Sequence, residues 1–377
     1  MRYIYRIMKR RIDISKQKIL QNIISGGTGE QSFLPSIREL ESITGCSRQT
    51  VHNALLELKA TGVLENLPRR GYRVLNAQLA RYLLRPLGEM QVAFVLPHWI
   101  QHGAASPLFR DILIGAEESL VANGGNLVYM TLPWRADEKK FDLTKLNFRA
   151  RKISGAMLVG PTPDFVAEQF IAQSDVPTVL VDNITDLAGA TCVSQDNLGG
   201  AARAVRYLFE KGHRRIGMIS VNPRKMRLNE RFAGFYAEMH KKGLLSEIAF
   251  TEEVNWDDDT VEGGAEAAHS LLRKGLNGAT AILALNDNMA FGAMQEFQKH
   301  GLSIPDDLSI IAIGTDPVIA GLCNPRLTTL GVDYREMGQA GLNALLDIMR
   351  YPSSVGRTLL LNLTLNEQRS VRNLNEK

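Results

Sequence analysis

The sequence contains little cysteine and no long apolar run. Its three cysteines, Cys46, Cys192 and Cys323, are scattered without a CxxC pair, which argues against a disulfide framework or a zinc ribbon. No run of about eighteen apolar residues is present, so a membrane-spanning helix is not expected. The N-terminal MRYIYRIMKRR is basic, but it lacks the apolar stretch and the cleavage site of a secretory signal. These absences predict a protein of the reducing cytoplasm with no membrane association.

Patterns of catalysis and of cofactor binding are also absent. There is no Walker A segment, no GxGxxG after a strand and no nucleophile elbow. His98 and His102 are four residues apart, but HWIQH lacks the glutamate of a zinc protease, and Pro97 and Gly103 indicate a loop. The sequence therefore predicts no enzyme activity, no cofactor and no metal site.

Charge is distributed unevenly along the chain. The first ninety residues carry 15 Lys and Arg against 7 Asp and Glu, a net charge of +8. Because the whole chain has a net charge of +4, the remainder has a net charge of −4. A basic domain can neutralise phosphates and release their counterions, which gives affinity for nucleic acid of any sequence. Charge alone leaves open the alternative of an ordinary solvated surface.

Residues 34–74 have the order of a winged helix-turn-helix: helix, sharp turn, helix and basic hairpin. Before them, a first helix is expected to begin at Asp13 or Ser15 and to end in the glycine-rich segment 26–29. The alternative that fits the same pattern is a trihelical protein-interaction module with surface arginines.

The second helix of this pattern is expected to start after Ser36, which forms a capping box with Glu39. Gly45 allows the turn, and Ser47 can cap the third helix. Strands are expected over 63–67 and 72–75. The predicted buried side chains of the two helices are Ile37, Leu40, Ile43, Val51, Ala54, Leu55 and Leu58.

Residues at the start of the third helix and at the hairpin tip are the predicted DNA contacts. Arg48 is the strongest candidate for base reading, because its planar fork can donate twice to guanine, and Gln49 could address adenine in the same way. Arginines at a glycine-bearing hairpin tip suit a narrow minor groove. The predicted set is Arg38, Ser47, Arg48, Gln49, His52, Arg70 and Gly71.

The segments LPSIREL, SRQTV and RRGYRV resemble the DNA-binding domain of GntR-type regulators over roughly residues 12–75. The resemblance implies that Arg38, Arg48 and His52 contact DNA. Relatives often have arginine at the last of these positions, so His52 is a departure that puts this contact in doubt.

From Gln91 onward, short β-branched runs alternate with amphipathic segments. QVAFVL, GAMLVG, TVLVD, RRIGMIS, TAILAL and LSIIAIG have the length of strands, and helices are expected between them. This alternation predicts an α/β fold with two doubly wound parallel-sheet subdomains, in which ligands bind beyond the carboxyl ends of the strands.

Several longer stretches resemble the LacI/GalR effector module, which is similar to periplasmic sugar-binding proteins: DNLGGAARAVRYLFEKGHRRIGMIS, RFAGFYAEM, ALNDNMAFGAMQEF, GLSIPDDLSIIAI and NPRLTTL. The combination of this module with a GntR-type head is similar to the arabinose-repressor arrangement. The resemblance implies a small-molecule effector held between two subdomains, with contacts from Phe109, Asp182, Arg231, Trp256, Asn286 and Asp316.

Two departures concern this effector site. Where relatives have an aspartate after the SVVGF-like strand, this chain has Gly314, Thr315 and Asp316, so the expected acid is displaced. The alternatives are that Thr315 takes its place, that Asp316 does, or that neither does. Lys225 and Arg227 precede Arg231 and raise the hypothesis of an anionic effector such as a phosphosugar. The alternative is that both cations simply face solvent.

The expected domains are a winged helix-turn-helix over residues 1–75, a linker over 76–90 and an effector module over 91–377. Within the module, subdomain 1 is expected to comprise about 91–194 and 331–353, and subdomain 2 about 195–330 and 354–377. The sequence thus predicts a cytoplasmic, ligand-responsive transcription regulator, most simply a homodimeric repressor of a carbohydrate operon that binds double-stranded DNA. A sugar-binding protein or a sugar-processing enzyme without gene regulation are the alternatives.

Overall fold

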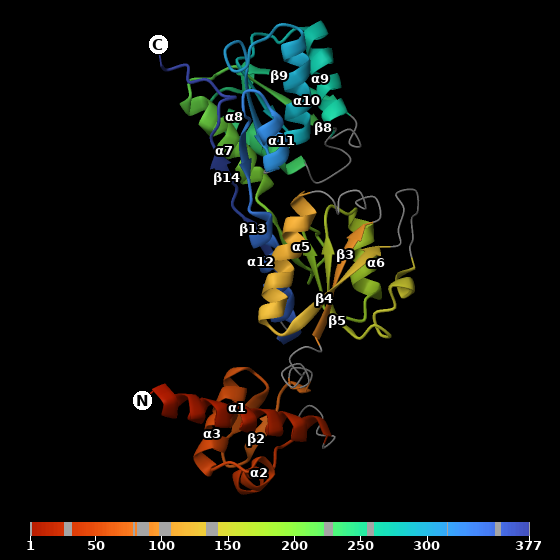
Figure 1. Cartoon of the computed structure of the whole chain (residues 1–377), viewed down its shortest axis with the longest axis vertical. Helices are drawn as coiled ribbons and strands as arrows, with labels where there is room; N and C mark the ends of the chain where they lie inside the picture. Colours follow the sequence, from red (N-terminus) through yellow and green to blue (C-terminus); the bar gives the residue numbers. More distant parts are fainter. Residues whose placement is uncertain are drawn as a thin grey trace.

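The computed structural model describes residues 2–25, 32–77, 80, 90–97, 107–132, 142–221, 229–254, 260–314, 316–350 and 356–376. Figure 1 shows a small N-terminal head and two α/β units. The predicted fold class is confirmed, because both units are built on six-stranded, mostly parallel sheets.

The head consists of three helices and a hairpin. Its elements are α1 (Arg2–Ser25), α2 (Ile37–Thr44), α3 (Arg48–Ala60), β1 (Leu64–Leu67) and β2 (Gly71–Val74). Ser36 and Glu39 form the predicted capping box at the start of α2, and Gly45 ends that helix in the left-handed conformation with φ 65°. The core contains Leu40, Leu55 and Leu58, each at most 1% exposed.

Three features of the head differ from the prediction. α1 begins at Arg2, well before Asp13, and Ser15 is buried within the helix rather than capping it. Ile43 is 40% exposed, and Thr44 takes the buried position beside Leu40 because its hydroxyl donates to the Leu40 carbonyl oxygen at 2.7 Å. A third strand-like segment also joins the hairpin, since Leu34 N–H donates to Tyr72 O and Val74 N–H donates to Ser32 O, both at 2.8 Å.

We expect Ser36→Ala to lower the free energy of unfolding of the head by about 1 kcal/mol, because it removes a cap that satisfies orphan amides of α2. The Ser36 side chain accepts from Glu39 N–H at 3.4 Å, and the Glu39 carboxylate accepts from Ser36 N–H at 2.7 Å. Urea unfolding of the full chain followed at the head measures the loss. Ser25→Ala, at the exposed end of α1, is the control; equal losses in both variants would contradict the prediction.

The first sheet has the strand order β13-β7-β6-β5-β3-β4, and all of its neighbouring strands are parallel. α5 and α12 cover one face, and α6 covers the other (Figure 1). Its elements are β3 (Met90–Pro97), α5 (Pro107–Ala122), β4 (Gly125–Leu132), η2 (Leu143–Leu146), β5 (Ile153–Val159), α6 (Asp164–Gln173), β6 (Thr178–Val181), β7 (Thr191–Gln195), α12 (Tyr334–Arg350) and β13 (Thr358–Leu361).

The second sheet has the order β14-β12-β11-β10-β8-β9 and is parallel except for the antiparallel edge strand β14. α7 and α8 pack on one face, and α9 and α10 on the other. Its elements are α7 (Asn197–Glu210), β8 (Ile216–Val221), α8 (Asn229–Lys241), η3 (Leu245–Glu247), β9 (Ile248–Val254), α9 (Val261–Lys274), β10 (Ala281–Ala284), α10 (Asp287–Lys299), β11 (Ser309–Ile313), α11 (Pro317–Leu322), β12 (Thr328–Gly331) and β14 (Thr364–Asn366).

The chain passes between the two sheets three times: after β7, after β12 and between β13 and β14. The crossings lie side by side, because Leu361 is paired with Gln195 in the first sheet and Thr364 with Gly331 in the second. The predicted division assigned 354–377 to the second subdomain as a whole, whereas β13 completes the edge of the first sheet beside β7.

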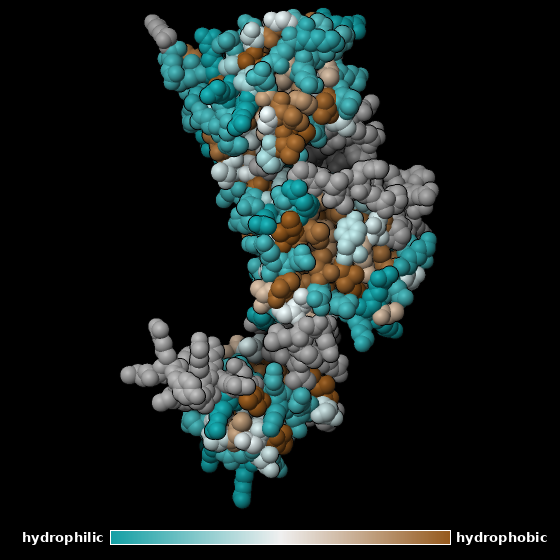
Figure 2. Space-filling view, in the orientation of Figure 1, coloured by the Kyte–Doolittle hydropathy of each residue, from teal (hydrophilic) through white to brown (hydrophobic). Residues whose placement is uncertain are grey.

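None of the helices in the described parts of the chain is long and apolar enough to cross a membrane. Most of the surface on view in Figure 2 is hydrophilic, with apolar side chains gathered in small areas such as that over α11. Val318 and Leu322 of this helix are 57% and 61% exposed. Scattered apolar side chains of this extent are ordinary on a folded surface.

Candidate functional site

The start of α3 presents a polar, solvent-exposed face. Arg48, Gln49 and His52 are all exposed on it, while Val51 and Leu55 are buried against the rest of the head. The Ser47 hydroxyl accepts from Thr50 N–H and caps the helix. Gln49 Nε2 donates to Asn53 Oδ1 at 3.0 Å, so Asn53, which the sequence reasoning missed, orients the Gln49 amide. A helix with such a face can enter the major groove.

The hairpin tip is a second exposed basic element. Gly71 has φ 92° and Arg69 has φ 65°, so the chain turns here through left-handed backbone that glycine adopts without strain. The Arg70 guanidinium lies 5.6 Å from the ring centroid of Phe33, a cation–π contact that keeps this arginine at the tip. Arg38 is exposed on α2. Every residue of the predicted DNA-contacting set is therefore accessible to a ligand.

The body contains a buried arginine at the carboxyl ends of the second sheet. Arg231, in the first turn of α8, is 5% exposed. Its Nη1 donates to the carbonyl oxygens of Leu285 at 2.5 Å and Ile313 at 3.2 Å, which follow β10 and end β11. Its Nε donates to Asn197 Oδ1 at 2.7 Å. The Glu238 carboxylate, about two helical turns further along α8, pairs with Arg206 and not with Arg231.

Asp182 follows β6 of the first sheet, and its charge interacts with that of Arg231. Burial raises the pKa of the Asp182 carboxyl to about 6, an effect that Arg231 and a hydrogen bond from Gln195 partly oppose. Gln195 Nε2 donates to Asp182 Oδ1 at 3.4 Å, and Oε1 of this 5% exposed side chain has no partner among the described residues. The carboxyl ends of both sheets therefore contribute buried polar groups to one region.

Asn286 and Asp287 lie where the strand order of the second sheet reverses, between β8 and β10. Such switch points are where doubly wound sheets bind ligands. The Asn286 side chain accepts from Met289 N–H at 2.8 Å and caps α10. Asp287, which the sequence reasoning missed although it adjoins Asn286, is 6% exposed, and its Oδ1 accepts no hydrogen bond from the described residues. Burial raises the pKa of Asp287 to about 6.

The structure gives Asp316 another role besides the predicted effector contact. Its Oδ1 accepts from Val318 N–H at 2.9 Å and from Ile319 N–H at 3.2 Å, so it caps α11. Its own N–H donates to Asp287 Oδ2 at 2.8 Å. Gly314 leaves room for this arrangement, because a Cβ there would overlap the Asp287 carboxylate. The Asp287 carboxylate thus fills the space that a side chain at position 314 would occupy.

Phe109 is half-buried in the first turn of α5 and packs against the core of the body. Trp256 and Thr315 lie outside the described residues. Lys225 and Arg227, on which the anionic-effector hypothesis rests, also lie outside the described residues, as do His98 and His102. The structure therefore brings together Asp182, Arg231 and Asn286, with Asp287, Gln195 and Asn197 as neighbours that the sequence did not single out.

We expect Asp287→Asn to stabilise the protein at neutral pH. An acid whose pKa is raised from 3.8 to about 6 by folding binds its proton more tightly when folded, so stability is lost as pH rises through that window. The asparagine oxygen can still accept from Asp316 N–H. The free energy of unfolding at pH 7.5 should rise by about 1–3 kcal/mol, and the gain should shrink towards pH 4.

Urea unfolding of wild type and Asp287→Asn at the two pH values makes this measurement. Asp306→Asn, at an exposed position after α10, is the matched control. A loss of stability in Asp287→Asn that is the same at both pH values would contradict the prediction.

Known proteins resemble both parts of the chain. Residues 15–74 match the family of bacterial regulatory proteins, gntR family, and residues 205–371 match the periplasmic binding protein-like domain. The ribose operon repressor of Haemophilus influenzae is 30% identical over 274 residues, which are 71% of this chain and 79% of that protein.

Solved structures show the same architecture as the body. A LacI family transcriptional regulator from Enterococcus faecium with bound ribose has a TM-score of 0.61 at 22% identity, over 75% of this chain and 99% of its own. The lac repressor dimer bound to operator and an anti-inducer has a TM-score of 0.63 at 21% identity, over 80% of this chain and all of its own. These two likenesses concern the fold.

Proposed function

This chain belongs to the LacI family of transcription regulators and carries a gntR-type DNA-binding head, and on that premise we propose that it represses a carbohydrate-utilisation operon. In this proposal the head binds a double-stranded operator. A sugar or sugar derivative binds beside Arg231 and changes the affinity for that operator. The protein acts as a homodimer in the cytoplasm and catalyses no reaction.

The observation that carries the proposal is the buried Arg231 with two carboxyl groups near it, in a chain whose α3 exposes a polar face. A polyol suits such a site, because each hydroxyl both donates and accepts hydrogen bonds. Asp182 and Asp287 supply acceptors and Arg231 supplies donors. A ligand without these hydroxyls would leave buried polar atoms unpaired, which makes the site selective.

Coupling of the two sites follows from the placement of the polar groups on both sheets. Asp182 belongs to the first sheet, whereas Arg231 and Asn286 belong to the second. A ligand that contacts both favours the arrangement in which they are close, and it changes operator affinity to the extent that the head binds DNA differently in that state. A two-fold operator would match a two-fold dimer.

Retention of genomic DNA tests the DNA-binding part of the proposal. Purified protein is incubated with sheared DNA from its source at physiological salt, and the retained fragments are sequenced. We expect enrichment of a palindrome near sugar-uptake or glycosidase genes. Uniform retention, with or without a panel of sugars, would mean that the head recognises charge alone and would overturn the proposal.

Titration of that palindrome with a sugar panel that includes ribose tests the effector part. We expect at least one sugar to shift operator affinity by about 5–150-fold, the usual size of allosteric coupling. Unchanged affinity throughout would favour the alternative of a sugar-binding protein without regulation. Turnover of any sugar in the same samples would favour an enzyme.

A further inference from the structure

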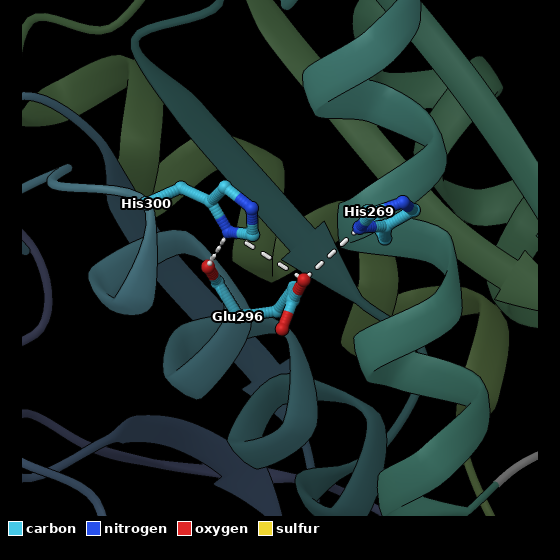
Figure 3. Close-up of side chains that lie close together, drawn as sticks. All are labelled: His269, Glu296 and His300. Carbon is cyan, nitrogen blue, oxygen red and sulfur yellow. Dashed lines mark hydrogen bonds and ion pairs between the residues drawn. The ribbon is translucent and has the colours of Figure 1, made fainter.

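A second polar cluster lies at the other end of α10 from Asn286, roughly 15 Å away by the rise of a helix. It consists of His269 from α9 and of Glu296 and His300 from α10, whose side chains point toward one another in Figure 3. Imidazole nitrogen and carboxylate oxygen together are the donor set of Zn²⁺ and of neighbouring transition metals. We propose that this cluster is a binding site for a divalent transition-metal cation such as Zn²⁺.

The distances within the cluster are close to those that tetrahedral Zn²⁺ requires. With metal–ligand bonds of about 2.0–2.1 Å, neighbouring ligand atoms are roughly 3.4 Å apart. Glu296 Oε1 lies 3.1 Å from His269 Nδ1 and 3.5 Å from His300 Nδ1. All three ligand atoms lie within 4.8 Å of one another, so the two rings need to approach each other by at most about 1.4 Å.

The two helices that supply the ligands are held in a close and fixed approach. A Cβ at Gly264 of α9 would overlap the carbonyl oxygen of Met289, and a Cβ at Gly292 of α10 would overlap that of Val261. Because backbone packs directly on backbone here, the distance between α9 and α10 cannot drift with side-chain motion. The ligands are therefore preorganised across two helices.

Glu296 is the centre of the cluster, and both of its carboxylate oxygens have partners. His269 Nδ1 lies 3.1 Å from Oε1, and Lys299 Nζ lies 3.3 Å from Oε2. A metal-bound carboxylate usually has such a partner on its other oxygen. The Glu296 side chain is 13% exposed, whereas His269 is 54% exposed, so solvent and cations can reach the cluster from the His269 side.

Cation binding replaces two protons. The proton on His269 Nδ1 is donated to Glu296 Oε1 at 3.1 Å, and the proton on His300 Nδ1 is donated to the Glu296 carbonyl oxygen, with Oε1 3.5 Å away. The cation takes their place, the ring protons move to Nε2, and water completes the tetrahedron. His300 Nδ1 also gives up its 2.9 Å hydrogen bond to the Glu296 carbonyl oxygen. No oxidation or bond cleavage is involved.

Titration of the tag-free, chelator-treated full chain with Zn²⁺ by calorimetry, and with Co²⁺ by visible absorbance, tests the site. We expect His269→Ala to bind the cation at this site at least roughly tenfold more weakly than wild type, so that it takes up one cation fewer per chain at concentrations that just saturate wild type. Glu296→Gln should show the same loss. Addition of Zn²⁺ should raise the Tm of wild type but not of these two variants.

The control is His240→Ala, which removes an exposed histidine from the end of α8 in the same subdomain and should behave as wild type. His269 is an exposed side chain, so His269→Ala remains informative even if Glu296→Gln unfolds. Equal stoichiometry and equal Tm shifts in wild type and His269→Ala would overturn the proposal, as would absence of cation binding in wild type. Operator binding is not a readout here, so failure of this proposal is distinct from failure of the proposed function.

Discussion

Replacement of Arg231 by alanine is expected to give a protein that holds its operator but no longer responds to the effector. Arg231 is a buried cation at the carboxyl ends of β10 and β11, and its charge interacts with that of Asp182 of the first sheet. If the effector accepts two hydrogen bonds from the Arg231 guanidinium, at about 1.5–3 kcal/mol each, their loss weakens effector binding at least about 100-fold. The head is built from other residues, so operator affinity without effector should be unchanged.

To measure this loss, effector is titrated into the operator complexes of wild type and of Arg231→Ala, and release of the operator is compared. Arg206→Ala is the matched control, because Arg206 is a partly exposed arginine on α7 that pairs with Glu238. Alanine at position 231 also leaves the Leu285 and Ile313 carbonyl oxygens without this donor, so some loss of stability is expected. Arg231→Lys keeps the charge without the planar fork and separates the two effects. A wild-type dose response in both variants would contradict the assignment.

The second large effect is expected from Arg48→Ala in α3. If Arg48 donates twice to one guanine, its loss costs about 1–3 kcal/mol, or roughly 5–150-fold in operator affinity. Affinity for unrelated DNA should change little. There Arg48 reads no base and is only one of many positive charges that contact phosphates. The operator and unrelated DNA are compared by fluorescence anisotropy at one fixed salt concentration.

The control for this comparison is Lys59→Ala, which removes one exposed positive charge from the last turn of the same helix. It should weaken binding to both DNAs by a similar small factor. Equal losses of Arg48→Ala on operator and on unrelated DNA would mean that Arg48 contacts phosphate and does not read a base.

The head could be predicted from the sequence because its determinants are local. Ser36 and Glu39 are three residues apart and cap α2 as expected, and Ser47 caps α3 in the same way. The start of α1 could not be predicted, because Asp13 and Ser15 are good capping residues in the middle of a helix that continues through them. A capping residue permits a helix start but does not impose one.

The family resemblance names Asp182, Arg231 and Asn286, and their contact with an effector stays a prediction. Their surroundings could not be predicted, because the partners of Arg231 include backbone carbonyl oxygens 54 and 82 residues further along the chain. His269 meets Glu296 and His300 only because α9 packs on α10. Glu296 and His300 alone have the spacing of one helix face, a signal too common to indicate a site.

Three connecting segments that lie side by side join the two sheets, and their number determines how the two halves of the body can move. A single connection would permit rotation about any axis, whereas three neighbouring ones leave chiefly a bend about the line that joins them. The first sheet is also the part of the body that follows the head in the chain. Under the proposed function, we expect occupancy of a site around Arg231 to reach the DNA-binding domain as a change of angle between the two sheets rather than as a change of length.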